Sequence, residues 1–289
     1  MHNRLVIGYD GSEASGSALR WAVAEAERRS ASVSVVASYA MPRVMNVYGI
    51  GIDGATPDEL ARLEASCRSG VETAVQAALE EHPGVGLEFD VVDHDPATSL
   101  LAAGREADLV VVGSNGLGPV KDYLFGSVLG TMLHECVCPV VVVPSQIRPH
   151  TNRIVVGVDG SAASDEALAW AVAEGEVRQA ALNIVHAWEY PFSLRERGVG
   201  RRSEFAEVDA ALVLDGAMEA AVARLGGSVS GELREGNATE LLVAAGEEAD
   251  LIAVGSRGRG GFHSMLLGSV AREVAARATC PVCVIRSAS

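Results

Sequence analysis

Residues 106–116, EADLVVVGSNG, and residues 248–258, EADLIAVGSRG, are two versions of one segment. In each version a short apolar run ends at a Gly-x-x-Gly pair, and a Gly-Ser pair follows after nine intervening residues, at Gly126 and at Gly268. The apolar run is typical of a strand buried on both faces of a parallel sheet. Glycines after such a strand let the backbone approach a ligand, and a Gly-Ser pair that opens a helix offers free N–H groups to an anion. The pattern therefore predicts two phosphate-binding sites.

The repetition extends over almost the whole chain. VIGYDGSEAS at 6–15 matches VVGVDGSAAS at 155–164 at an offset of 149 residues, and VCPVVVV at 137–143 matches TCPVCVI at 279–285 at an offset of 142. Copy two is therefore seven residues shorter between its second and third strands. We expect the difference in the loop at 40–57, because length changes usually fall in surface loops.

The chain of 289 residues has the length of two domains, and 48% apolar residues are ample for packed cores. We place domain 1 at residues 1–146 and domain 2 at residues 151–289. The segment SQIRPHTN at 145–152 is polar and broken by proline, as expected of a linker.

Short apolar runs alternate with helical patterns in both copies. In copy one we expect strands at 4–9, 32–38, 87–92, 108–112 and 139–143, and helices at 12–29, 57–81, 97–105 and 126–136. Copy two repeats this order from Arg153 to Ile285. The alternation predicts an α/β fold, with a doubly wound parallel sheet and right-handed crossovers in each domain. Ligands of such sheets bind at the carboxyl ends of the strands, where the strand order reverses.

Asp10 and Asp159 directly follow the first strand of each copy. If the first and fourth strands are neighbours at the point of reversal, Asp10 and Gly113 frame one crevice, and Asp159 and Gly255 frame the other. A carboxylate there can accept hydrogen bonds from a base or a ribose. The alternative is a turn aspartate before a helix. Recurrence of the residue beside a second glycine loop favours the functional interpretation.

Each part of the pattern also has a purely structural interpretation. The Gly-x-x-Gly segments could be ordinary strand-to-helix turns, and Ser127 and Ser269 could be common residues at a helix start. Gly8 and Gly157, inside the first strands, could clear space for a ligand or for a tightly packed helix. Only the full spacing, present twice, points strongly to phosphate.

The net charge of the chain restricts which ligands it can bind and how it can hold a phosphate group. A net charge of −15 argues against nucleic acid or an anionic membrane as partner, since both require a basic surface. Lys121 is the only lysine, and no Gly-Lys-Ser/Thr sequence is present, which excludes a P-loop NTPase. Phosphates would therefore be held locally, by backbone amides, a helix N-terminus or a divalent cation.

The cysteines and the apolar runs indicate the compartment. The chain has five cysteines, which is an odd number. We see no signal peptide in the opening residues MHNRLVIGYD, and no apolar run approaches the ~20 residues of a membrane span. We expect a soluble, cytoplasmic protein with reduced thiols. Cys280 and Cys283 form a C-x2-C pair, but no second pair or histidine cluster completes a metal site. We interpret them as buried strand cysteines.

Together, the doubled glycine pattern, the early aspartate and the final Cys-Pro-Val strand resemble the universal stress protein family, of the ATP-binding kind. The chain resembles the tandem-domain members found in actinobacteria over nearly its whole length. The resemblance implies a five-stranded parallel sheet in each domain, ordered 3-2-1-4-5, with helices on both faces. It also implies ATP as the ligand. Mg²⁺ could bridge the triphosphate as the divalent cation considered above, but no carboxylate cluster with clear ligand spacing specifies it.

The motifs and the resemblance together assign two nucleotide sites. By resemblance, Asp10 and Asp159 contact the nucleoside, and Ala187 lies at the adenine. In domain 1 the site comprises Gly8, Asp10, Ser38, Gly113, Ser114, Asn115, Gly116, Leu117, Gly118, Gly126, Ser127 and Val128. In domain 2 it comprises Gly157, Asp159, Ala187, Gly255, Ser256, Arg257, Gly258, Arg259, Gly260, Gly261, Gly268, Ser269 and Val270. No catalytic or metal-ligating residue is assigned, and His186, which precedes Ala187 and has no counterpart in copy one, is interpreted as structural.

The two sites differ in charge. Arg257 and Arg259 stand where copy one has Asn115 and Leu117. We also match Gly236 with Asp95, before the third helix, which makes copy one the more electronegative. We expect both copies to bind ATP, copy two more tightly.

Four kinds of protein could use such sites. The first is a nucleotide-dependent regulator in stress response or dormancy, and the second is a slow ATPase or self-phosphorylating protein. The second needs a positioned base, and none is apparent beside Ser127 or Ser269. The third is an adenylylating enzyme, but the sequence signatures of such enzymes are absent. The fourth is an inert scaffold, which would not need two intact glycine loops. We favour the regulator, with weak ATPase activity at most.

Assembly can also be anticipated. The last strands, 139–143 and 281–285, are apolar and lie at sheet edges, which need covering. Relatives commonly pair through this strand, so the two copies could pair within one chain. We also expect a homodimer through these edges and a regulatory protein partner.

Overall fold

The computed structural model describes residues 3–39, 56–114, 126–148, 150–189, 201–259 and 267–287, and only the backbone of 201–206. The elements of the first half are β1 (Arg4–Tyr9), α1 (Glu13–Arg29), β2 (Ser32–Ser38), α2 (Pro57–Glu81), β3 (Leu87–Val92), α3 (Pro96–Gly104), β4 (Leu109–Gly113), α4 (Ser127–Glu135) and β5 (Val140–Val143). Those of the second half are β6 (Arg153–Gly157), α5 (Ala162–Arg178), β7 (Ala181–Trp188), α7 (Arg201–Leu225), the short 3₁₀ helix η1 (Gly226–Ser228), β8 (Val229–Glu235), α8 (Ala238–Gly246), β9 (Leu251–Gly255), α9 (Ser269–Arg277) and β10 (Val282–Ile285). The expected order of elements is confirmed.

Side chains in the sequence determine where the helices begin. Ser12 caps α1 by accepting a hydrogen bond from the Ser15 N–H, and Ser161 does the same for α5. Thr56 and Glu59 form a reciprocal capping box ahead of α2, whose first residue is Pro57. These contacts satisfy backbone donors that a helix start leaves without partners.

The shorter length of copy two is divided between two connections. The offset of 149 falls to 144 at the end of the long helix, where Glu81 corresponds to Leu225, and to 142 at the next strand, where Leu87 corresponds to Val229. Five of the seven missing residues thus precede the end of α7, and two are lost after it. The sequence-based expectation located the loop before the helix but missed the shorter turn behind it.

All strands join into one sheet of order β3-β2-β1-β4-β5-β10-β9-β6-β7-β8. Each half has the expected order 3-2-1-4-5 with parallel neighbours, which confirms the fold class. The halves meet where β10 pairs antiparallel with β5, with Cys283 opposite Val141. The edges expected to make a homodimer are therefore already paired within the chain, and that route to a homodimer is wrong. The outermost strands of the sheet are β3 and β8.

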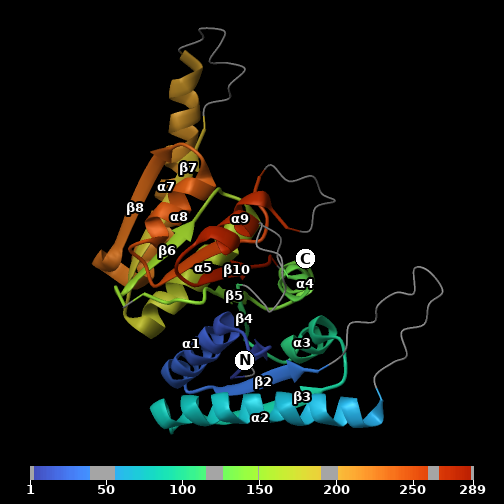
Figure 1. Cartoon of the computed structure of the whole chain (residues 1–289). Helices are drawn as coiled ribbons and strands as arrows, with labels where there is room; N and C mark the ends of the chain where they lie inside the picture. The colour runs from blue at the N-terminus through green and yellow to red at the C-terminus, as the bar shows by residue number, and fades with distance from the viewer. Residues whose placement is uncertain are drawn as a thin grey trace, which may run out of the picture.

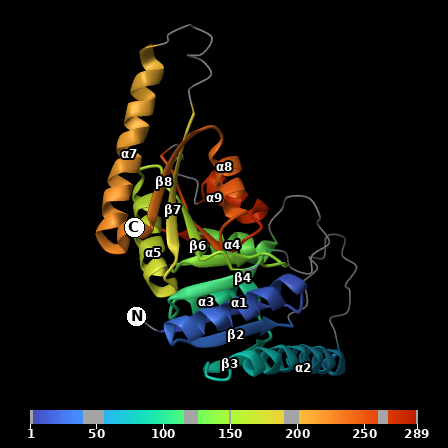
Figure 2. The ribbon, with the colours of Figure 1, turned by 90° about the vertical axis from the view of Figure 1, so that its left-hand side faces the viewer.

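Helices cover both faces of this sheet (Figure 1). One apolar core lies under α1, α2, α5 and α7, and a second lies under α3, α4, α8 and α9. Each core includes residues of both halves, such as Leu5 with Ile154 in the first and Val110 with Ile252 in the second. The two copies therefore share continuous hydrophobic cores across the β5–β10 junction. Figure 2 shows the long helices α2 and α7 at opposite ends of the molecule.

A buried ionic cluster joins α1 to α5 on the first of these faces. Glu25 and Glu174 are 0% and 2% exposed, and their positions differ by the repeat offset of 149. Arg29 binds Glu25 on its own helix and Glu174 on the other, and Arg178 binds Glu174 and Glu25 in the mirrored way. Each guanidinium also lies over the tryptophan of the opposite helix, Arg29 over Trp170 and Arg178 over Trp21.

Within the described part of the chain, no helix has the length and apolarity to cross a membrane.

Candidate nucleotide site

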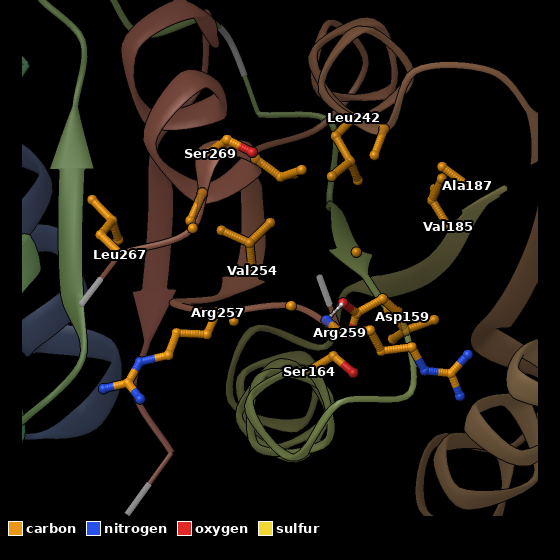
Figure 3. Close-up of a pocket in the computed structure, with 18 residues that line it drawn as sticks. Asp159, Ser164, Val185, Ala187, Leu242, Val254, Arg257, Arg259, Leu267 and Ser269 are labelled. Atoms are coloured by element: carbon orange, nitrogen blue, oxygen red, sulfur yellow. Dashed lines mark hydrogen bonds between the residues drawn. The ribbon is translucent and has the colours of Figure 1, made fainter. Parts of the chain in front are cut away.

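Asp159 and Gly255 lie at the carboxyl ends of neighbouring strands, because β6 pairs with β9 at the point where the strand order reverses. A cavity of about 570 Å³ opens there. Its wall comes from β6, β7, β9, α8 and the start of α9 (Figure 3). Residues predicted for the copy-two site and found in this wall are Gly157, Asp159, Ala187, Gly255, Arg257, Gly258, Arg259, Gly268, Ser269 and Val270. The volume lies within the range of small-molecule sites in proteins.

Asp159 is fixed in place by backbone donors. Its Oδ1 accepts a hydrogen bond from the Ser161 N–H at 3.0 Å, and its Oδ2 accepts one from the Arg259 N–H at 2.9 Å. Burial disfavours the charge, but the hydrogen bonds from Ser161, Arg259 and Ser164 outweigh it and hold the pKa of Asp159 below its usual value. The carboxylate is therefore an ionised acceptor at neutral pH, and it ties the glycine loop to the end of β6.

The glycine loop closes against the start of α9. The Gly268 N–H donates to the Ser256 carbonyl at 2.7 Å, and the Ser256 N–H donates to the Ile285 carbonyl. A Cβ added to Gly258 would lie 2.5 Å from Asp159 Oδ2, and one added to Gly268 would lie 3.8 Å from the Gly258 nitrogen. Both parts of the glycine pattern thus meet at one place. Ser256 itself is buried and lies outside the cavity wall, unlike the other predicted loop residues that are described.

Two strand glycines have packing roles that the sequence could not separate from ligand contact. A Cβ on Gly255 would stand 2.6 Å from the Ala163 carbonyl carbon, so this glycine lets the start of α5 approach β9. A Cβ on Gly157 would stand 2.9 Å from Leu242 Cδ1, which packs over the strand from α8. In copy one, Gly8 packs in the same way against Leu100, and Gly113 packs against Ala14. Close packing is therefore a firm role for all four, although Gly157 and Gly255 also line the cavity.

The start of α9 faces the cavity through Ser269, Val270 and Ala271. Its N-cap is Gly268, which has no side chain, and none of the described residues caps it with a side chain. The first N–H groups of a helix have no partner within the helix, and they carry the positive end of its dipole. In copy one, Gly126 is the N-cap ahead of Ser127 and Val128 at the start of α4, and again no side chain of the described residues caps the helix. This is the local geometry that favours an anion.

The two arginines of the copy-two loop do not converge. Figure 3 shows the guanidinium groups of Arg257 and Arg259 extending to opposite sides of the site. That of Arg259 lies over Gly160, where its Nη2 is 2.7 Å from the position that a Cβ on Gly160 would take. The arginines therefore stand at the rim, and most of the remaining wall consists of glycines and apolar side chains.

Several wall residues were missed by the sequence-based prediction. They are the apolar residues Val158, Val185, Ala238, Leu242, Val254, Leu267 and Ala271, and the helix residue Ser164. The alternation of side chains along β7 could have placed Val185 on the same face as Ala187. The other residues come together only through the tertiary fold.

His186 is buried on β7, and its Nδ1 lies 2.6 Å from the Val158 carbonyl oxygen. Because a carbonyl oxygen only accepts, Nδ1 carries the proton. The ring holds the end of β6 directly before Asp159. The structure thus gives His186 a supporting position behind the cavity, as its structural interpretation requires.

Copy one repeats this framework where it is described. Asp10 Oδ1 accepts a hydrogen bond from the Ser12 N–H at 2.9 Å, and the Ser114 N–H donates to the Val143 carbonyl. The Ser38 hydroxyl donates to the His94 carbonyl at 2.5 Å, which ties the end of β2 to the turn before α3. The predicted residues Asn115, Gly116, Leu117 and Gly118, and in copy two Gly260 and Gly261, lie outside the described residues.

One sequence alignment between the copies was wrong. The third helix of each half is capped by Asp95 and by Asn237, each of which accepts a hydrogen bond from the N–H three residues on. Asn237, and not Gly236, is therefore the counterpart of Asp95. The charge difference remains, because a carboxylate is replaced by a neutral amide of the same shape.

Comparison with known proteins agrees with this geometry. The model of the universal stress protein family matches residues 1–144 and 150–286. A universal stress protein of Mycolicibacterium smegmatis is 31% identical over 296 residues, which cover 98% of this chain and 96% of that protein. Universal stress protein Rv2623 of Mycobacterium tuberculosis is also 31% identical, with the same coverage. A crystal structure of a universal stress protein from Archaeoglobus fulgidus has the same fold over 100% of both chains, with a TM-score of 0.69 at 22% identity. The chain therefore belongs to the universal stress protein family, with two family domains in tandem.

Proposed function

We propose that this protein is a cytoplasmic ATP-binding regulator of a stress or dormancy response, and that it exposes different surfaces to a protein partner with and without nucleotide. The observation that carries the proposal is the cavity at the β6–β9 crossover, with Asp159 on one side and the uncapped start of α9 on the other. A carboxylate acceptor and a helix N-terminus are complementary to the two ends of a nucleotide, the ribose hydroxyls and the phosphates.

The apolar wall supports a planar base between them. Val185, Ala187 and Leu242 line the cavity away from the glycine loop, and Figure 3 shows their side chains grouped on one side. An adenine ring would bury its faces against such residues, whereas a sugar or a free phosphate would leave them unused. The residues present therefore fit a nucleotide better than an isolated anion.

The charge distribution decides how phosphates would be held. With a net charge of −15, the protein as a whole repels a triphosphate. The attraction is local, from the N–H groups of Ser269 and Val270, the loop around Gly258, and the arginines at the rim. Mg²⁺ would add positive charge by bridging phosphate oxygens. We propose that copy two binds more tightly, since copy one lacks the arginines at 257 and 259 and has Asp95 in place of Asn237.

The test is to identify and titrate the nucleotide. The purified protein is precipitated with acid, the released nucleotide is identified, and ATP, AMP and a cyclic nucleotide are then titrated by calorimetry with and without Mg²⁺. We expect released ATP and two sites of unequal affinity for added ATP. Continuous release of ADP and phosphate would instead indicate an ATPase. Failure of every nucleotide to bind would refute the proposal.

Glycine variants assign the two sites. Gly258→Ala places a methyl group 2.5 Å from Asp159 Oδ2, so the carboxylate must move and the tighter site should be lost. Gly116→Ala should remove the weaker one. Gly70→Ala is the control, because a Cβ there has no neighbour within 4 Å. A surviving site in Gly116→Ala that is weaker than the one surviving in Gly258→Ala would overturn the ranking.

A further inference from the structure

Two thiols of copy one lie together where α4 ends and β5 begins. Cys136 is the C-cap residue of α4, and Cys138 precedes Pro139 at the entry to β5. Their Sγ atoms are 3.5 Å apart and share a hydrogen bond. A disulfide bond is about 2.0 Å long, so the sulfurs need to approach by only about 1.5 Å to form one.

The surroundings distinguish the two sulfurs. Cys136 is 2% exposed, Cys138 is half-buried, and Val137 between them is 69% exposed. The hydrogen bond from the Cys138 thiol, the backbone N–H groups of Val137 and Cys138, and the charge of Arg286 outweigh burial and lower the pKa of Cys136 to about 7. The same hydrogen bond and burial raise the pKa of Cys138. Cys136 is thus the sulfur that ionises first, with a protonated thiol beside it.

Copy two provides a natural comparison. Ala278 stands at the position equivalent to Cys136, and Cys280 at the position equivalent to Cys138, at the offset of 142. Burial raises the pKa of Cys280 to about 12. In copy two the shared cysteine is therefore a lone buried, protonated thiol, whereas in copy one the added Cys136 makes its half-buried counterpart part of a dithiol.

We propose that Cys136 and Cys138 are a redox-active pair that a hydroperoxide converts to an intramolecular disulfide. The pair lies at the end of α4 remote from Ser127 and makes no use of the nucleotide cavity of copy two. The proposal is therefore independent of the proposed nucleotide binding.

The reaction balances in two steps. The Cys136 thiolate attacks the terminal oxygen of the hydroperoxide, the O–O bond breaks, and the alcohol (water, for hydrogen peroxide) leaves with a proton from solvent, so that Cys136 becomes a sulfenic acid. The Cys138 sulfur then attacks the Cys136 sulfur, the S–S bond forms, and the hydroxyl group leaves as water with the Cys138 proton. Two thiols lose two electrons and two protons in total, and the peroxide is reduced. A dithiol reductant reverses the change by thiol–disulfide exchange.

The test is a peptide map of the folded full-length protein. The protein is treated with one equivalent of hydrogen peroxide, quenched, denatured, alkylated and digested with trypsin. We expect the tryptic peptide 122–153 to lose about two mass units and to resist alkylation, and a reductant to restore both thiols. The peptide with Cys280 and Cys283 should remain fully alkylated, as an internal control.

Single variants identify the order of events. In Cys138→Ala, the sulfenic acid on Cys136 has no partner and should be trapped by a dimedone probe. In Cys136→Ala, Cys138 should stay as unreactive as Cys280. Full alkylation of both cysteines after peroxide, or equal oxidation of Cys280 and the 136–138 peptide, would overturn the proposal. Should either variant fold poorly, the map of the unaltered chain still decides the question.

Discussion

The carboxyl groups of Glu25 and Glu174, one from each copy, are bound by the same two arginines, Arg29 and Arg178, inside the interface between α1 and α5. Two carboxylates so close cannot both ionise without repulsion, and the flanking arginines offset that repulsion only in part. The pKa values move apart as a result. Burial and the charge of Glu25 raise the pKa of Glu174 to about 7 despite the arginines, whereas Arg178 and Arg29 outweigh burial and lower the pKa of Glu25.

The stability of the protein should therefore fall as the pH rises from 4.5 to about 7. In this window the folded chain holds a proton on Glu174 that the unfolded chain has lost, so deprotonation favours unfolding, by about 3 kcal/mol over the window. Urea unfolding at several pH values measures the slope. Glu174→Gln should abolish it, and Glu176→Gln, on the exposed side of the same helix, should leave it intact. An unchanged slope in Glu174→Gln would contradict the raised pKa of Glu174.

Removal of one arginine from the cluster should be costly. Arg178→Ala leaves Glu25 and Glu174 buried with a single cation between them, and the loss of one partner from a buried ion pair typically destabilises by about 3–5 kcal/mol. Arg28→Ala is the matched control, because among the described residues Arg28 forms an ion pair with Glu25 alone and its side chain is 32% exposed. Equal unfolding midpoints for the two variants would show that the cluster contributes nothing to holding the copies together.

Gly255→Ala should destabilise the fold by about 1–3 kcal/mol, the usual cost of overpacking. The new methyl group would meet the backbone of Ala163 and Ser164, which cannot move aside as a flexible side chain can. Gly70→Ala, in the open middle of α2, should instead stabilise by about 0.5–1 kcal/mol. Thermal unfolding of both variants measures the difference. Similar midpoints would mean that the α5–β9 contact is looser than described.

His186→Ala should lower stability by about 1–3 kcal/mol, because it leaves the buried Val158 carbonyl without its ring donor. Nucleotide affinity should weaken with it, since Asp159 follows Val158. If ATP turnover is detectable, its rate at saturating ATP should not change. A selective loss of turnover with unchanged stability would make His186 a participant in chemistry.

The sequence predicted elements better than it predicted contacts between them. The strand and helix positions followed from apolar runs and caps, which are local signals, and the crossover position of Asp159 and Gly255 followed from the repeated spacing. The pairing of β5 with β10 could only be offered as one of several ways to cover an edge. Glu25 and Glu174 gave no signal at all, because a charged residue on a helix is usually on a solvated face and only the tertiary fold buries these two.

The role of Gly255 shows a second limit. A glycine that admits a ligand and a glycine that admits a helix have the same sequence signature, since both remove a side chain from a crowded place. Only the position of α5 separates them. In contrast, the role of Gly258 beside Asp159 was accessible in principle, because both residues belong to the motif that recurs in each copy.

The β5–β10 junction has a consequence for how this protein can evolve. In an assembly of two identical chains, every mutation appears in both partners at once, and assembly depends on concentration. Here both halves belong to one polypeptide, so their pairing does not depend on protein concentration. A mutation also changes one half without changing the other. Arg257 in one loop against Asn115 in the other, and Cys136 against Ala278, are divergences that such an arrangement permits. A single polypeptide can thereby acquire two unequal copies of one domain.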